Sequence, residues 1–153
     1  MESAVTFDAQ GDVPSMSGMQ TQARPPNRGG GTNPQPRREV PITILVVDDD
    51  DQLRKVVSSM LRHAGYTTLA AADGSEALAL AESHQGAIGL LLSDILMPGM
   101  DGHELARRIQ LSRPGLRVVL MSGASSAGTA VLAKPFAMKT LLDVVRSTLS
   151  VMA

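Results

Sequence analysis

The feature that most constrains the fold is a regular alternation, beginning at Pro41, between short apolar runs and longer stretches with helical periodicity. Residues 42–47 are rich in β-branched side chains, which is typical of a strand buried on both faces of a parallel sheet. The apolar residues that follow have the spacing of one face of an amphipathic helix; they are Leu53, Val56, Val57, Met60 and Leu61. Gly65 stands where such a helix ends. The pattern therefore begins with a strand followed by a helix.

The same alternation continues along the rest of the chain. Further strands are expected at residues 66–71, 88–93, 116–121 and 129–133, and further helices at about 74–83, 101–111 and 138–150. Asp73 and Glu76 have the spacing of a capping box at the start of the second helix. Alternation through five strands predicts an α/β fold, in which a parallel sheet carries helices on both faces.

Residues 1–40 have a different composition from the rest. They are rich in Gly, Pro, Gln and Ser, and such a segment cannot bury enough apolar surface to offset the entropy lost on ordering. We therefore expect a disordered N-terminal tail over residues 1–40 and one domain over residues 41–153.

Composition excludes several classes of function. Lys and Arg number 14 against 15 Asp and Glu, so the chain lacks the basic excess that indicates nucleic-acid binding. It contains no Cys, which excludes disulfides and thiolate metal sites. No apolar run approaches the ~18 residues of a membrane span, and the N-terminus does not resemble a signal peptide. A cytoplasmic protein with no nucleic-acid or membrane partner is expected.

Polar side chains stand at the ends of four of the predicted strands. Asp48 and Asp49 follow the first strand, Asp94 the third, Ser122 the fourth and Lys134 the fifth. In an open α/β sheet, ligands bind outside the carboxyl ends of the strands, so these side chains should converge on one edge. Any one of them alone is weak evidence, but their coincidence at four strand ends predicts a functional site.

The chemistry of this set points to phosphoryl transfer. Neighbouring carboxylates raise the pKa of at least one of their number unless a cation joins them. Carboxylate, carbonyl and water oxygens suit Mg²⁺, which often binds beside phosphate. Phosphoryl transfer needs charge neutralisation and positioning, which Lys134 and the Ser122 hydroxyl can supply. An Asp carboxylate is a competent nucleophile, so Asp94 is predicted to form an aspartyl-phosphate.

Four segments resemble, in the same order, the four signatures of response-regulator receivers from bacterial two-component systems. They are residues 44–50 (ILVVDDD), 93–102 (SDILMPGMDG), 121–123 (MSG) and 134–136 (KPF). Each signature alone has moderate specificity, but the ordered set is highly specific and the match runs from about residue 42 to residue 150. The chain therefore resembles a receiver domain, either a stand-alone receiver or one of the hybrid-kinase type.

The resemblance implies a fold and an activity. The fold is a flavodoxin-like, doubly wound sheet of five parallel strands in the order 2-1-3-4-5. The activity is acceptance by Asp94 of a phosphoryl group from a phosphohistidine on a sensor histidine kinase or a histidine phosphotransfer protein. Such a receiver is a phospho-acceptor that assists its own phosphotransfer and dephosphorylation, and is not an enzyme with a separate substrate.

The resemblance also implies the roles of the residues around Asp94. Asp49 corresponds to the direct Mg²⁺ ligand, and Asp48 acts largely through water. The backbone carbonyl of Leu96, together with Asp94 itself, completes the metal site. Ser122 corresponds to the switch hydroxyl.

Lys134 corresponds to the lysine that pairs with the phosphoryl group, and the Lys134–Pro135 bond is expected to be cis.

The chain departs from the family pattern in two ways. Val131 stands where the family usually has Tyr or Phe, and only 11 residues separate Ser122 from Lys134. Because a crossover between parallel strands takes at least ~10–12 residues, the fourth helix is expected to be shortened or missing. Since related receivers dimerise or dock through that helix, this chain is expected to stay monomeric.

Two other classes share parts of this pattern. A Mg-dependent phosphohydrolase of the haloacid dehalogenase type carries Asp-x-Asp and then Thr or Val after its first strand; Asp48 and Asp50 fit, whereas Gln52 does not. That alternative leaves Asp94 and the motif after it unexplained. A flavin-binding protein of the same sheet order would lack the cluster of lysine and carboxylates. Steady turnover of a phosphate ester would indicate the phosphohydrolase, and a single acyl phosphate the receiver.

Overall fold

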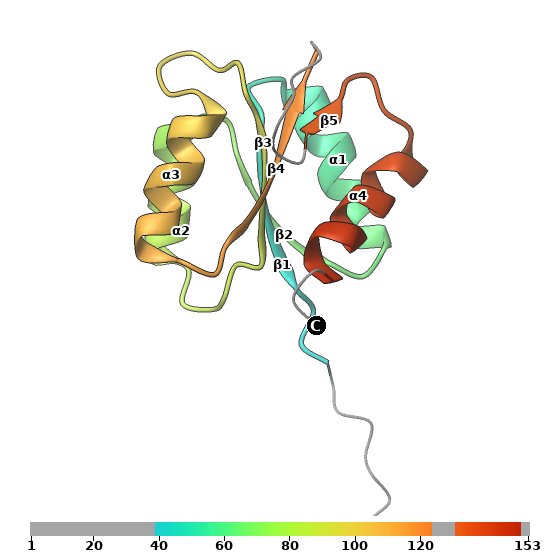
Figure 1. Cartoon of the computed structure of the whole chain (residues 1–153), viewed down its shortest axis with the longest axis horizontal. Coiled ribbons are helices and arrows are strands. Elements are labelled where there is room, and N and C mark those ends of the chain that lie inside the picture. The colour runs from blue at the N-terminus through green and yellow to red at the C-terminus, as the bar shows by residue number, and fades with distance from the viewer. Residues whose placement is uncertain (1–38, 124–130, 151–153) are drawn as a thin grey trace, which may run out of the picture. The chain divides into compact units, whose positions relative to one another are not determined.

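A computed structural model describes residues 39–123 and 131–150 of the chain. Its five strands form one parallel sheet in the order β2-β1-β3-β4-β5 (Figure 1). The strands are β1 (Thr43–Val47), β2 (Thr67–Ala71), β3 (Leu90–Asp94), β4 (Arg117–Ser122) and β5 (Val131–Ala133). The described helices are α1 (Asp51–His63), α2 (Gly74–Ser83), α3 (Gly102–Ser112) and α4 (Met138–Ser150). The expected α/β fold and strand order are therefore confirmed.

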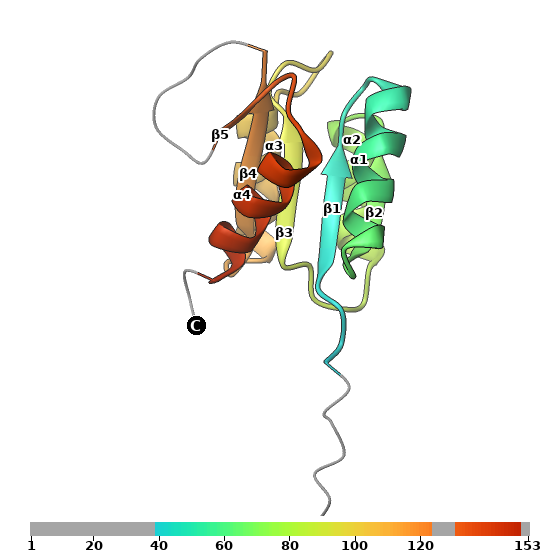
Figure 2. The same ribbon diagram turned by 90° about the vertical axis from the view of Figure 1, so that its right-hand side faces the viewer.

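Helices cover both faces of this sheet (Figure 2). Successive side chains of a strand point to opposite faces, so β1 contributes to two separate cores. Leu45 and Val47 pack in the core beneath α2 and α3, whereas Ile44 and Val46 pack in the core beneath α1 and α4. All four side chains are fully buried, which explains why this strand reads as an uninterrupted apolar run.

The first three helices begin at aspartates that follow strands β1, β2 and β3. Asp50 accepts hydrogen bonds from the amides of Gln52 and Leu53, and Asp73 and Asp101 each accept one from the amide three residues later. Each cap satisfies backbone donors that have no partner within the helix. These caps hold the loops at the carboxyl edge of the sheet.

The connection between β4 and β5 is short. It comprises residues 123–130, of which 124–130 lie outside the described residues. Eight residues are too few for a crossover that contains a helix of ordinary length. The prediction of a shortened fourth crossover is thereby confirmed, and the described part of β5 begins at Val131. Residues 129 and 130, which we assigned to this strand, lie outside the described residues.

The expected tail over residues 1–40 concerns a segment of which the structure describes only Glu39 and Val40, both exposed. The domain boundary near residue 40 therefore stays a prediction. Across residues 39–123 and 131–150, none of the helices is long and apolar enough to cross a bilayer.

Arg113, at the carboxyl end of α3, ties together the turn that follows α2. Its guanidinium donates hydrogen bonds of 2.7–2.9 Å to the backbone carbonyls of Ala81, His84 and Gly86. We expect Arg113→Ala to lower the free energy of unfolding by about 2 kcal/mol, because it leaves these acceptors without their charged donor. Thermal unfolding should show a decrease in Tm of roughly 8 °C or more. Arg113→Lys should recover only part of the loss, since an ammonium lacks the planar fork. An unchanged Tm for Arg113→Ala would contradict this role.

Candidate functional site

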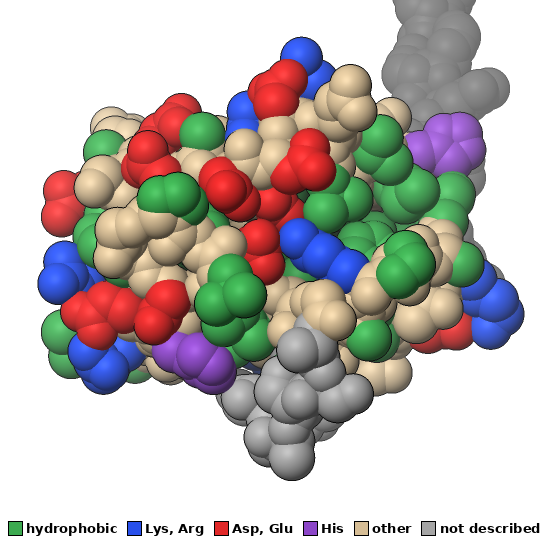
Figure 3. Space-filling model, turned by 90° about the horizontal axis from the view of Figure 1, so that it is seen from above, with side chains coloured by type: hydrophobic (Ala, Val, Ile, Leu, Met, Phe, Trp, Pro, Cys, Tyr) green, Lys and Arg blue, Asp and Glu red, His purple; other side chains and the backbone are tan. Residues whose placement is uncertain are grey.

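The predicted site residues come together at one edge of the sheet. Asp48 directly follows β1, Asp94 is the last residue of β3, Ser122 is the last residue of β4, and Lys134 directly follows β5. The parallel register places these strand ends side by side. Seen from above in Figure 3, acidic side chains gather next to a basic side chain at the middle of this edge. The arrangement follows from topology, because parallel strands bring all of their carboxyl ends to the same side.

Three carboxylates form the centre of the site. Asp48, Asp49 and Asp94 each place one carboxylate oxygen so that the three oxygens lie within 4.8 Å of one another. Asp48 and Asp94 are 1% and 9% exposed, whereas Asp49 is open to solvent. A set of hard oxygen donors that is buried on one side and open on the other fits a divalent cation that keeps several waters. These residues therefore fit Mg²⁺.

Lys134 contacts two of these carboxylates. Its Nζ lies 2.9 Å from Asp48 Oδ2 and 3.3 Å from Asp94 Oδ2. The lysine is held by its backbone as well, because its amide donates a 2.8 Å hydrogen bond to the carbonyl of Ser122. The Lys134–Pro135 peptide bond is cis, as predicted.

In the electrostatics of the site, clustered carboxylates surround the ammonium group of Lys134. Burial raises the pKa of Asp94 and the charge of Asp48 adds to this, while Lys134 and the backbone amide of Leu96 partly offset it. Burial alone would lower the pKa of Lys134, but its bonds to Asp48 and Asp94 outweigh burial, so the pKa is raised. The charged form of Lys134 is therefore favoured, and the ionised form of Asp94 is disfavoured by burial and by the neighbouring carboxylate of Asp48.

The run of four aspartates after β1 divides into two functional pairs. Asp48 and Asp49 belong to the carboxylate centre. Asp50 caps α1, and Asp51 forms ion pairs with Arg54 and Lys55 on the same helix. Two of the four acids therefore serve the local structure of α1, and the other two form part of the carboxylate centre.

Comparison with known proteins identifies the family. The family model for the response regulator receiver domain matches residues 44–146. This chain belongs to that family. The solved receiver domain of the hybrid histidine kinase CckA is similar to it at 42% sequence identity with a TM-score of 0.65, covering 71% of this chain and 99% of that one. The chemotaxis protein CheY4 of Vibrio cholerae is similar at 30% identity with a TM-score of 0.66 and the same coverage.

Curated relatives of this receiver are mostly longer proteins. The sensor kinase CckA of Brucella abortus is 33% identical over 70% of this chain but only 12% of its own length. The transcriptional regulatory protein TcrX of Mycobacterium tuberculosis is 31% identical over 71% of this chain and 50% of its own length. The chain thus spans half or less of these relatives. Because the matching family model and the solved CckA domain are receivers, the haloacid dehalogenase alternative has no support.

Two further predicted residues lie beside the carboxylates of the receiver. Ser122 is 6% exposed at the end of β4. Leu96, two residues after Asp94, directs its amide to the Asp94 carboxylate, and the residue is 77% exposed. An apolar side chain therefore stands open to water next to the predicted acceptor.

Gly102 is a site residue whose role the sequence does not reveal. A Cβ at this position would lie 2.4 Å from the backbone carbonyl oxygen of Asp94, so only glycine lets α3 start this close to the end of β3. We expect Gly102→Ala to cost about 1–3 kcal/mol of stability and to slow phosphorylation, because the clash displaces Asp94. Gly99→Ala is the matched control: Gly99 has a φ of +84° but no atom within 4 Å of an added Cβ. It should lose stability through backbone strain and keep its phosphorylation rate. Equal phosphorylation rates in the two variants would contradict the prediction.

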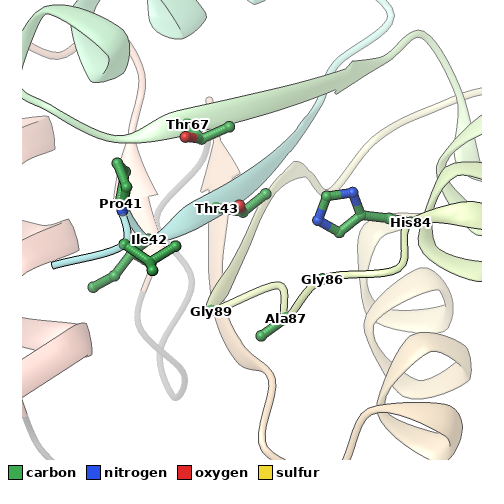
Figure 4. A pocket seen from close by; sticks show the side chains of 9 residues that line it. Pro41, Ile42, Thr43, Thr67, His84, Gly86, Ala87 and Gly89 are labelled. Atoms are coloured by element: carbon green, nitrogen blue, oxygen red, sulfur yellow. The ribbon is translucent and has the colours of Figure 1, made fainter. Parts of the chain in front are cut away.

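A pocket of about 440 Å³ lies at the opposite edge of the sheet (Figure 4). It is lined at the amino ends of β1 and β2 by residues including Ile42, Thr43, Thr67 and His84. Among the described residues, this lining includes no carboxylate or lysine, whereas the clustered carboxylates and Lys134 lie at the carboxyl edge.

Proposed function

We propose that this receiver takes a phosphoryl group onto Asp94 from a phosphohistidine of a sensor kinase or a histidine phosphotransfer protein. The observation that carries the proposal is the placement of the Asp94 carboxylate, 3.3 Å from Lys134 Nζ and within the 4.8 Å cluster that includes Asp48 and Asp49. A nucleophile, a fixed positive charge and a set of metal ligands are thus gathered around one point.

In the proposed reaction, an Asp94 carboxylate oxygen attacks the phosphorus atom of the donor. The oxygen–phosphorus bond forms as the phosphorus–nitrogen bond breaks, and the imidazole nitrogen keeps the electron pair of that bond. Lys134 can neutralise negative charge on the phosphoryl group bound to Asp94, because its Nζ already contacts the Asp94 carboxylate. Ser122, at the adjacent strand end, supplies a hydroxyl for a phosphoryl oxygen.

Asp48, Asp49, Asp94 and the backbone carbonyl of Leu96 would hold the metal ion of this site, with Asp49 as its most accessible carboxylate. When bound, Mg²⁺ would neutralise charge on these carboxylates and on the incoming phosphoryl oxygens. A related CheY from Borrelia burgdorferi, 27% identical with a TM-score of 0.65, has been solved in a complex with CheX, BeF3 and Mg. That structure supports the choice of metal for this chain.

The proposed partner is the kind of phosphoryl donor that the receiver family uses. We infer that a kinase or a phosphotransfer protein is the donor, and that the chain acts as a phospho-acceptor rather than as an enzyme with turnover. We further propose that the receiver occupies residues 41–153, functions as a monomer in the cytoplasm, and uses neither nucleic acid nor membrane as a partner.

The proposal is tested by incubating the purified chain with acetyl phosphate, with and without Mg²⁺. Intact-mass measurement should show one added phosphoryl group in Mg²⁺ and none in EDTA. Phosphotransfer profiling against the sensor kinases of its host would then find the donor. Steady release of inorganic phosphate from a phosphate ester, without a phosphorylated protein, would contradict the proposal.

The lifetime of the phosphorylated state should be long, because the side chains at two family positions that affect the attacking water are apolar. These are Leu96, which is exposed beside Asp94, and Ala124, which lies outside the described residues. Replacing Leu96 with Asn and Ala124 with Glu should shorten the lifetime several-fold, since both new side chains can hydrogen-bond a water. The decay of the phosphorylated species by mass measurement checks this. An unchanged or longer lifetime would contradict the prediction.

A further inference from the structure

Arg54 links the first turn of α1 to the loop that carries Asp48 and Asp49. Its Nη1 donates a 2.7 Å hydrogen bond to the backbone carbonyl of Asp48, and its Nη2 bonds the carboxylate of Asp51. The side chain is only 16% exposed, so this guanidinium is largely shielded from water. Hydrogen bonds from a charged donor are about twice as strong as neutral ones. Arg54 therefore holds this backbone carbonyl firmly.

The carbonyl that Arg54 holds belongs to the peptide bond that joins Asp48 to Asp49. Because a peptide unit is planar, fixing its oxygen also fixes the direction in which the chain enters Asp49. Asp49 needs this support, since its side chain is open to solvent and is not held by packing. The side chain of Asp48 is already held, by the amide of Asp50 and by Lys134, both at 2.9 Å.

We propose that Arg54 is a positioning residue for the Mg²⁺ site, acting through the peptide between Asp48 and Asp49. The inference rests on the proposed function, because it assigns a role toward the same metal. Arg54 bonds the backbone carbonyl of Asp48 and the carboxylate of Asp51, which lies outside the carboxylate cluster. Its role is to fix the orientation of the backbone from which the Asp49 carboxylate projects.

Charge and positioning make opposite predictions for this residue. A positive charge near the site repels a divalent cation, so its removal on electrostatic grounds alone would tighten Mg²⁺ binding. Loss of positioning would weaken binding. The direction of the change in Kd therefore separates the two effects.

The test measures the Kd for Mg²⁺ by calorimetry at constant ionic strength in the wild type, Arg54→Met and Lys55→Met. Lys55 is the matched control, because it pairs with Asp51 at 2.9 Å but is 76% exposed, and in the described part of the chain the loop carbonyl of Asp48 is bonded by Arg54 instead. We expect Arg54→Met to weaken binding about tenfold, in the range seen when groups that orient metal ligands are removed. Lys55→Met should leave the Kd unchanged or make it slightly tighter.

Arg54→Lys keeps the charge but not the two-pronged geometry, and should bind Mg²⁺ with an intermediate Kd. The Tm without metal and the gain in Tm on adding Mg²⁺ provide a second readout, which separates metal affinity from loss of folding. If Arg54→Met does not fold, a wild-type Kd in a folded Arg54→Lys variant overturns the inference. Mg²⁺ binding by Arg54→Met that is equal to or tighter than wild type also overturns it. A wild type that fails to bind Mg²⁺ would overturn the proposed function together with the inference.

Discussion

Replacement of Asp94 by Asn is expected to abolish phosphorylation and to leave the fold intact. Asn keeps the size of the side chain but removes the carboxylate oxygen that attacks phosphorus, so no acyl phosphate can form. Intact-mass measurement after incubation with acetyl phosphate and Mg²⁺ should show only the unmodified protein. Asp143→Asn is the control, because Asp143 is an exposed carboxylate of α4 that pairs with Lys139. It should accept one phosphoryl group at the wild-type rate.

The same substitution should raise the stability of the metal-free protein near neutral pH. Burial and the charge of Asp48 raise the pKa of Asp94 in the folded state, so its ionised form destabilises the fold. This penalty is absent below the ordinary carboxyl pKa of ~4 and complete above the raised pKa. Asp94→Asn should therefore have a higher Tm than the wild type at pH 7, and the two values should converge as the pH falls toward 4. Phosphorylation of Asp94→Asn at the wild-type rate would show that the acceptor is another residue.

Asp49→Asn is expected to weaken Mg²⁺ binding at least tenfold, which corresponds to about 1.4 kcal/mol. Asp49 offers the most exposed of the three clustered carboxylates, and its charge would attract a divalent cation to this edge. Calorimetric titration with Mg²⁺ measures the Kd directly. Phosphorylation by acetyl phosphate should need correspondingly higher Mg²⁺ concentrations.

Asp51→Asn is the matched control for this prediction. It removes the same charge from the same acidic run, but Asp51 is bonded to Arg54 and Lys55 and lies outside the carboxylate cluster. The amide oxygen of Asn can still accept a hydrogen bond from Arg54. The Kd for Mg²⁺ should therefore change little. Equal losses of affinity in the two variants would indicate a diffuse acidic patch in place of a defined metal site.

The positions of the strands, the helices and the main site residues were predictable because each depends on a local signal. Two-sided burial makes β1 a continuous apolar run, and helix α1 shows its buried face in the spacing of Val57 and Leu61. The predicted strand ends then place Asp94 and Lys134 at one edge of the sheet. The prediction for β3 was less accurate at its start, because the strand begins at Leu90 and not at residue 88; its end on Asp94 agrees with the prediction.

Two supporting residues could not be found in this way. Gly102 matters because its Cα approaches the carbonyl of Asp94, and a glycine in a loop motif does not reveal which backbone it touches. Arg113 lies just beyond the predicted helix of residues 101–111 with no local signal of a role, yet it binds carbonyls about 30 residues away in the chain. Both roles depend on contacts between segments that the chain brings together only on folding.

The sequence by itself determined the order of strands and helices, the edge at which the chemistry lies and the residue that should accept the phosphoryl group. Local periodicity and the topology of parallel sheets are sufficient for the first two conclusions, and the predicted acceptor follows from carboxylate chemistry and the resemblance to receivers. Only the tertiary structure decided which partner each of the four consecutive aspartates has. Asp48 is buried beneath Lys134, 86 residues away in sequence, whereas Asp50 caps a helix and Asp51 pairs with Arg54. Burial and the distance to a partner charge set the role of a carboxylate. Both are fixed when the sheet brings the ends of β1, β3, β4 and β5 together at one edge.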